Sequence, residues 1–167
     1  MEGNKGLVYL RIMRAPSKVI YANALTFEFG KGHILKENAA DKAVIISSGR
    51  GVHEALAAAK QLEQAGVLVG VVDMPSIDAA LLLDLYHSGK TIVIAEQNNG
   101  YIWSAYRNIL FKTGKTIDPT RLAPINTLDR EGKPQFIHSA TYAQLIHRFG
   151  LAPEQLFERR DLAVTTD

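Results

Sequence analysis

The chain has no cysteine among its 167 residues. This absence excludes disulfide bonds, thiolate nucleophiles and thiolate metal sites together, and it agrees with a cytoplasmic location. No apolar stretch reaches the roughly 18 residues that a membrane-spanning helix needs. The first residues also lack the apolar core of a secretory signal. We therefore expect a soluble, cytoplasmic protein that does not act at a membrane.

The chain also lacks a strong excess of charge. Its formal net charge is +2, from 19 Lys and Arg against 17 Asp and Glu. The basic residues are scattered along the sequence, so no nucleic-acid partner is expected. The five histidines show no H-E-x-x-H or other ligand spacing, and no G-x-S-x-G motif occurs. These absences argue against a histidine metal site and against a hydrolase of the nucleophile-elbow type.

What the chain does contain is a series of apolar runs separated by helical patterns. The runs cover residues 43–46, 67–73 and 92–96. Strands with unbroken apolar character are typical of parallel sheets that are covered on both faces. The 167 residues are enough for one domain, and 47% of them are hydrophobic, which is enough for that domain to have its own core. The sequence therefore predicts an α/β fold, a three-layer sandwich around a mostly parallel sheet.

The connections between these runs have the features of helices. After Gly51, apolar residues recur with helical spacing up to the stop at Gly66. A second helix is expected after Ser76 as its N-cap, and a third over residues 101–112. Further along the chain, the patterns predict the elements that follow: a fourth strand within 122–128 with Pro124 at its start or on an edge, and helices over 141–149 and 153–160.

Two loops that follow strands are candidate sites. Residues 47–51 join a strand to a helix N-terminus, where free amides and the helix dipole favour an anion. The candidate anion-binding residues are Ser47, Ser48, Gly49, Arg50 and Gly51. The motif is neither a P-loop nor a complete G-x-G-x-x-G, and short polar turns of this kind are common in α/β domains. Both interpretations stay open.

The second candidate site follows the run at 92–96. Glu96 is placed where an acid or base is often found, but a lone carboxylate also serves as a helix cap or an interface group. Asp73 and Asp78 have the same ambiguity. Aromatic residues beside such a loop are frequent in contact surfaces, although burial in the core competes with that interpretation. The candidate interface residues are Glu96, Gln97, Asn98, Trp103 and Tyr106.

Several segments, taken in order, resemble the C-terminal domain of the transketolase family of thiamine-diphosphate enzymes. They are residues 8–14, 30–35, 43–49, 71–78 and 92–96. The family includes transketolase, 1-deoxyxylulose-5-phosphate synthase and the beta subunits of 2-oxo acid dehydrogenases. The resemblance runs from about residue 6 to residue 157. The chain departs from the pattern at Gln97, where many relatives have an acidic residue, and after Gly100, where further glycines are missing.

The resemblance implies a structural part of an enzyme that transfers two-carbon ketol units. In the family, a Gly-Asp-Gly…Asn motif of the first domain holds the diphosphate and its divalent metal ion, Mg²⁺, and a glutamate of the second domain activates the cofactor. No Gly-Asp-Gly occurs here. The implied partners are a second copy, in a homodimer, and the missing N-terminal and pyrimidine-binding domains or subunit. We therefore expect this chain alone neither to bind thiamine diphosphate nor to catalyse the reaction.

The resemblance also suggests domain boundaries and one substrate contact. Residues 1–16 correspond to the end of the preceding domain or a linker, residues 17–160 to the C-terminal domain, and residues 161–167 to a frayed tail. Arg14 matches an arginine that binds a substrate phosphate in sugar-phosphate members, although a surface position before a proline turn is an equal alternative. Two other functions stay open: a separate α/β module that binds a phosphorylated or carboxylated ligand at residues 47–51, and an independent enzyme at the Glu96 edge.

Overall fold

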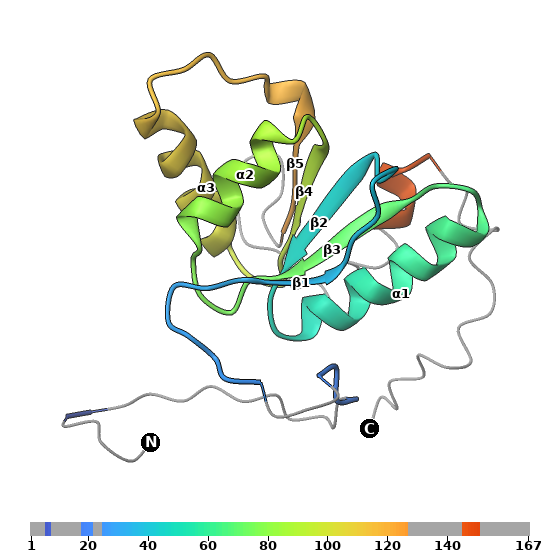
Figure 1. Ribbon diagram of the computed structural model, residues 1–167, viewed down its shortest axis with the longest axis horizontal. Coiled ribbons are helices and arrows are strands. Elements are labelled where there is room, and N and C mark those ends of the chain that lie inside the picture. Colours follow the sequence, from blue (N-terminus) through green and yellow to red (C-terminus); the bar gives the residue numbers. More distant parts are fainter. Residues whose placement is uncertain (1–5, 8–17, 22–24, 127–144, 151–167) are drawn as a thin grey trace.

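A five-stranded sheet forms the middle layer of the computed structural model, in which the described residues are 6–7, 18–21, 25–126 and 145–150 (Figure 1). The strands are β1 His33–Lys36, β2 Ala43–Ser47, β3 Val69–Asp73, β4 Thr91–Ala95 and β5 Leu122–Ile125. Their order across the sheet is β1-β3-β2-β4-β5. β1 pairs antiparallel with β3, and the other neighbours are parallel. The prediction of a mostly parallel sheet is confirmed.

Helices cover both faces of this sheet. They are α1 Arg50–Gln64, α2 Ala79–His87 and α3 Tyr101–Lys112, and a short 3-10 turn, η1 Pro119–Arg121, precedes β5. Helix α1 lies on one face, whereas α2 and α3 lie on the other (Figure 1). This arrangement is the expected three-layer sandwich. None of the described helices is long and apolar enough to cross a membrane.

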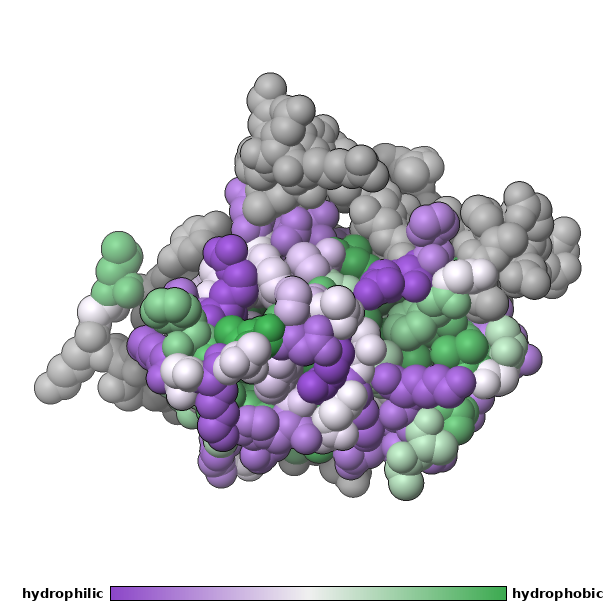
Figure 2. All heavy atoms as spheres, turned by 90° about the horizontal axis from the view of Figure 1, so that it is seen from above, coloured by the Kyte–Doolittle hydropathy of each residue, from purple (hydrophilic) through white to green (hydrophobic). Residues whose placement is uncertain are grey.

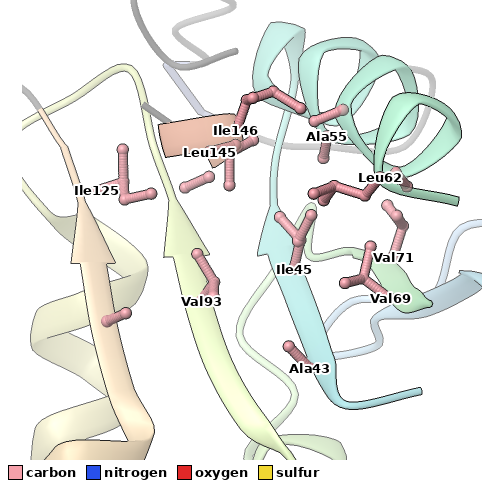
Figure 3. Packing of buried hydrophobic residues seen from close by; sticks show 14 residues of the cluster. Ala43, Ile45, Ala55, Leu62, Val69, Val71, Val93, Ile125, Leu145 and Ile146 are labelled. Carbon is pink, nitrogen blue, oxygen red and sulfur yellow. The ribbon is translucent and has the colours of Figure 1, made fainter. Parts of the chain in front are cut away.

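Alternation along the strands divides the apolar side chains between two cores. Ile45 and its odd-numbered neighbours pack under α1, whereas Ile46 and its even-numbered neighbours pack under α2 and α3. Leu145 and Ile146 extend the α1 core over β4 and β5 (Figure 3). Full burial on both faces is why β2 has no polar alternation in its sequence.

The parallel strands share one register. Ala43 pairs with Val69 on one side and with Thr91 on the other, and both pairings continue to the ends of the strands. The C-terminal residues Ser47, Asp73 and Ala95 therefore lie side by side. We call this side of the sheet the carboxyl edge, and it is where ligands usually bind in open α/β sheets.

The sheet has two edge strands. β1 is one of them, and a register shift lies between its residues Ile34 and Lys36. β5 is the other edge, and its Pro124 is exposed. An edge strand tolerates proline because one side of its backbone needs no ladder partner. The expected helices over 141–149 and 153–160 lie wholly or largely outside the described residues.

One predicted helix cap is wrong. The N-cap of α2 is Asp78 instead of Ser76, and the Asp78 carboxylate accepts a hydrogen bond from the Leu81 amide at 3.0 Å. Ser76 instead turns towards another segment, and its Oγ accepts from the Gly30 amide at 2.7 Å. Aspartate and serine are both good caps, so the choice depends on where the chain turns into the helix.

The surface in Figure 2 shows hydrophilic and hydrophobic residues interspersed on the face seen from above. Green residues on this face form separate groups among purple and white ones. Scattered apolar residues are normal on soluble domains.

Replacement of Asp78 tests its assignment as the N-cap of α2. Asp78→Ala is expected to lower the free energy of unfolding by about 1–2 kcal/mol, because the first turn of α2 loses its side-chain acceptor. Asp84→Ala changes the same residue type at an exposed position of the same helix and should stay within about 0.5 kcal/mol of the parent. Urea denaturation measures both. Equal effects of the two substitutions would contradict the cap.

Candidate functional site

The turn after β2 is held together by its own side chains and amides. The buried Ser47 hydroxyl donates to the Ala95 carbonyl at 2.6 Å and so bridges β2 and β4. The Gly51 amide donates to the Ser48 carbonyl at 3.1 Å, and the Val52 amide to the Gly49 carbonyl at 3.2 Å. These contacts occupy one hydroxyl and one amide of the predicted anion site, and also the amide that follows it, which gives the turn a structural role.

Glycine is required at position 51 for a steric reason. A Cβ atom there would lie 2.2 Å from Ser47 Oγ, far inside van der Waals contact. Gly49 has φ of +55°, a conformation that favours glycine. Arg50, the one cation of the turn, lies 3.7 Å from the Glu54 carboxylate in an ion pair. Anion binding at residues 47–51 stays a prediction.

Glu96 and Asn98 cap helix α3. The Glu96 carboxylate is buried and accepts from the Ile102 and Trp103 amides at 2.6 and 3.0 Å. Asn98 Oδ1 accepts from the amides of Gly100 and Tyr101 at 2.8 and 3.0 Å. A helix leaves its first amides without carbonyl partners, and here side chains satisfy four in succession. The cap, one of the alternatives for Glu96, is therefore the role that these contacts show.

The aromatic residues of α3 have different surroundings. Tyr106 is buried and donates to the Leu82 carbonyl at 2.8 Å, and this burial raises the pKa of its phenol. Trp103 is half-buried, and the Arg107 guanidinium lies 5.6 Å from its ring centroid. Gln97 is also half-buried. Of the candidate interface residues, Trp103 and Gln97 are thus more accessible than Tyr106. Arg14 lies outside the described residues.

A polar and aromatic cluster around Asp73 was not predicted as a unit. The Tyr21 hydroxyl donates to Asp73 Oδ2 at 2.5 Å. Burial, followed by this hydrogen bond and the negative charge of Asp73, raises the pKa of the Tyr21 phenol. The rings of Tyr21, Phe27 and His33 meet edge to face, with centroids between 5.2 and 5.8 Å apart. Tyr21 and Asp73 are 52 residues apart, so no local pattern reveals their contact.

His53, on the first turn of α1, lies in the electrostatic field of the same carboxylate. Burial is the main cause that lowers the pKa of its imidazole, the positive charge of Arg50 lowers it further, and Asp73 opposes both. Within the described part of the chain, no three His, Asp or Glu side chains are grouped to hold a metal ion.

Comparison with known proteins identifies the fold. The family model described as "Transketolase, C-terminal domain" matches residues 30–101. Transketolase of Rattus norvegicus is 28% identical over 161 residues, which are 92% of this chain and 24% of the relative. A protein of Methanocaldococcus jannaschii, whose name describes it as a transketolase C-terminal section, is 28% identical over 93% of this chain and 47% of its own length.

A solved structure agrees with these sequence matches. It is described as a split gene transketolase, inactive beta4 tetramer, and it is 27% identical with a TM-score of 0.57. The match covers 83% of this chain and 43% of that chain. This chain thus spans about a quarter of the first full-length relatives and less than half of the split-gene protein. The comparisons show similarity to this domain, whereas the activity of a whole enzyme needs a separate argument.

Substitution of Glu96 separates a cap from a chemical group. Glu96→Ala leaves two amides of α3 without their acceptor and should lower the free energy of unfolding by about 2–3 kcal/mol. Glu96→Gln keeps one oxygen acceptor in nearly the same shape and should recover part of that loss. Urea denaturation of both variants measures the difference. No loss of stability in Glu96→Ala would contradict the capping role.

Proposed function

We propose that this chain, which carries a transketolase C-terminal domain, is the structural third of an enzyme that transfers two-carbon ketol units. Other domains, in the same or in a separate polypeptide, would supply the cofactor site. The observation that carries this proposal is the agreement of fold and sequence with a split-gene transketolase over 83% of the chain. The ordered match of residues 30–101 to the family model supports it independently.

The contacts at the carboxyl edge support a structural role. Ser47 bridges two strands, Asp78 caps α2, and Glu96 caps α3. Each of these polar groups therefore maintains the fold of the domain itself. A catalytic acid or base would instead need a proton-transfer partner and access to substrate.

Thiamine diphosphate and Mg²⁺ belong to the complete enzyme in this proposal. Thiamine diphosphate supplies a nucleophilic carbon that carries the ketol unit between substrates when it is bound there. Among the described residues, no three His, Asp or Glu side chains are grouped to hold a metal ion. In this proposal the other domains hold both the metal ion and the diphosphate. This chain would then contribute position and contacts, and it would be inactive when alone. We also propose a cytoplasmic enzyme.

Self-association is the second part of the proposal. The outer side of α3 presents Tyr101, which is 66% exposed, and Phe111, which is 81% exposed. Between them, Arg107 lies against Trp103. Tyr, Trp, Phe and Arg are the residues enriched in protein interfaces. The split-gene relative is described as a tetramer, and we propose that this chain forms at least a dimer through the loop at 96–98 and α3.

Reconstitution tests the function. The purified chain is mixed with a polypeptide that holds the thiamine-diphosphate-binding domains of a transketolase from the same genome. Ketol transfer from a ketose phosphate to an aldose phosphate is expected only in the mixture, with thiamine diphosphate and Mg²⁺ added. A coupled assay of product formation measures the rate. Catalysis by the chain alone would contradict the proposal, and so would the failure of every such mixture.

Arg14→Ala tests the proposed substrate contact in the reconstituted enzyme. Because a guanidinium binds two phosphate oxygens, its loss should raise the KM for a phosphorylated donor about tenfold or more. Lys18→Ala removes a positive charge from an exposed position a few residues further along the chain, and it serves as the control. Steady-state kinetics compares the two variants. Equal KM values for the parent and Arg14→Ala would remove Arg14 from the site.

A further inference from the structure

We propose that Tyr21 and Asp73 form a latch that fixes the strap, residues 18–21 and 25–32, to the carboxyl edge of the sheet. Opening the latch would release the strap while the sheet stays folded. This inference concerns how the N-terminal side of the domain is held in place. It stands whether or not the chain takes part in ketol transfer.

The central contact is short and involves a buried partner. The Tyr21 hydroxyl donates to Asp73 Oδ2 at 2.5 Å, and the Asp73 residue is only 7% exposed. Hydrogen bonds to a carboxylate are stronger than those between neutral groups. Asp73 itself is fixed as the last residue of β3, in register with Ser47 of β2. The strap is therefore attached to a rigid point of the parallel sheet.

A second attachment holds the other end of the strap. The Gly30 amide donates to Ser76 Oγ at 2.7 Å, and the Gly32 amide donates to Asp78 Oδ2 at 3.3 Å. Gly30 and Gly32 lie immediately before β1, and Asp78 is the N-cap of α2. This end of the strap is therefore joined to the folded sheet and helix. Tyr21 is thus the attachment on which the first part of the strap depends.

The strap exposes most of its large apolar side chains. Val19 is 87% exposed and Phe29 is fully exposed, and Phe27 is more than half exposed although its ring meets His33. The hydrophobic effect grows with the apolar area that is removed from water, so it contributes little here. A single hydrogen bond can therefore control whether this segment stays in place.

Two buried polar atoms lower the stability of the closed state, in which Tyr21 is bonded to Asp73. Asp73 Oδ1 and His33 Nε2 have no hydrogen-bond partner among the described residues. Both residues take part in the cluster with Tyr21. Buried polar atoms without partners lose their hydration without compensation, and opening of the strap would allow water to reach them. This gain offsets part of the loss of the Tyr21 bond, which makes the latch reversible. Local opening of this kind is how weakly packed segments move in a folded protein.

Tyr21→Phe in the full chain tests the latch, because it keeps the ring and removes the hydroxyl. Limited trypsin digestion should cut after Lys18 about tenfold faster than in the parent, since a bond to a charged group contributes at least about that factor to opening. Cleavage after Lys31, which lies between the Gly30 and Gly32 contacts, should change much less. Cleavage after Lys115, an exposed site far along the chain, should keep its rate. Tyr101→Phe removes a hydroxyl from an exposed tyrosine and should change nothing.

A second variant and a second measurement separate local opening from general loss of stability. Asp73→Asn should also accelerate cleavage in the strap, and amide hydrogen exchange in β2 and β4 should stay protected in both variants. Unchanged cleavage after Lys18 in Tyr21→Phe would overturn the latch. Equal acceleration at Lys18 and Lys115, with loss of protection in the strands, would overturn it as well, because the contact would then stabilise the whole domain.

Discussion

The structure depends on the burial of both faces of a parallel sheet whose strands share one register. Every residue of the central strand β2 is buried, with odd positions under α1 and even positions under α2 and α3. A shift by one residue would exchange these two sets and place side chains against the wrong layer. The register therefore follows from packing, and it brings Ser47, Asp73 and Ala95 together at the carboxyl edge.

The carboxyl edge leaves backbone groups without partners in helices or strands, and polar side chains form hydrogen bonds with them. Strand ends and helix starts leave amides and carbonyls without partners, and burial without partners is unfavourable. Glu96 and Asn98 together satisfy four amides of α3, and the Ser47 hydroxyl satisfies the Ala95 carbonyl. Residues that look catalytic in the sequence are thus engaged in ending one element and beginning the next. This use of the edge agrees with a domain whose chemistry takes place elsewhere.

The layers of the fold could be predicted from the sequence, because apolar runs and helical stripes are local patterns. The strands around residues 43–46 and 92–96 follow from such patterns, as does a position of Pro124 at a strand start or on an edge. The choice of Asp78 over Ser76 as a cap could not be predicted, since it depends on contacts from Gly30 and Gly32. The Tyr21–Asp73 contact is even harder to predict from the sequence, because it joins a weakly patterned segment to a strand residue 52 positions away.

The described contacts at the carboxyl edge are contacts within the fold. In open α/β sheets, ligands enter where the carboxyl ends of the strands leave a crevice. Here the strap approaches that edge at Asp73, while side chains of the neighbouring loop turn back to cap α3. The edge therefore binds segments of its own chain. Under the proposed function, such a domain would affect the reaction mainly by fixing where its connections point, as expected of a structural domain in a multidomain enzyme.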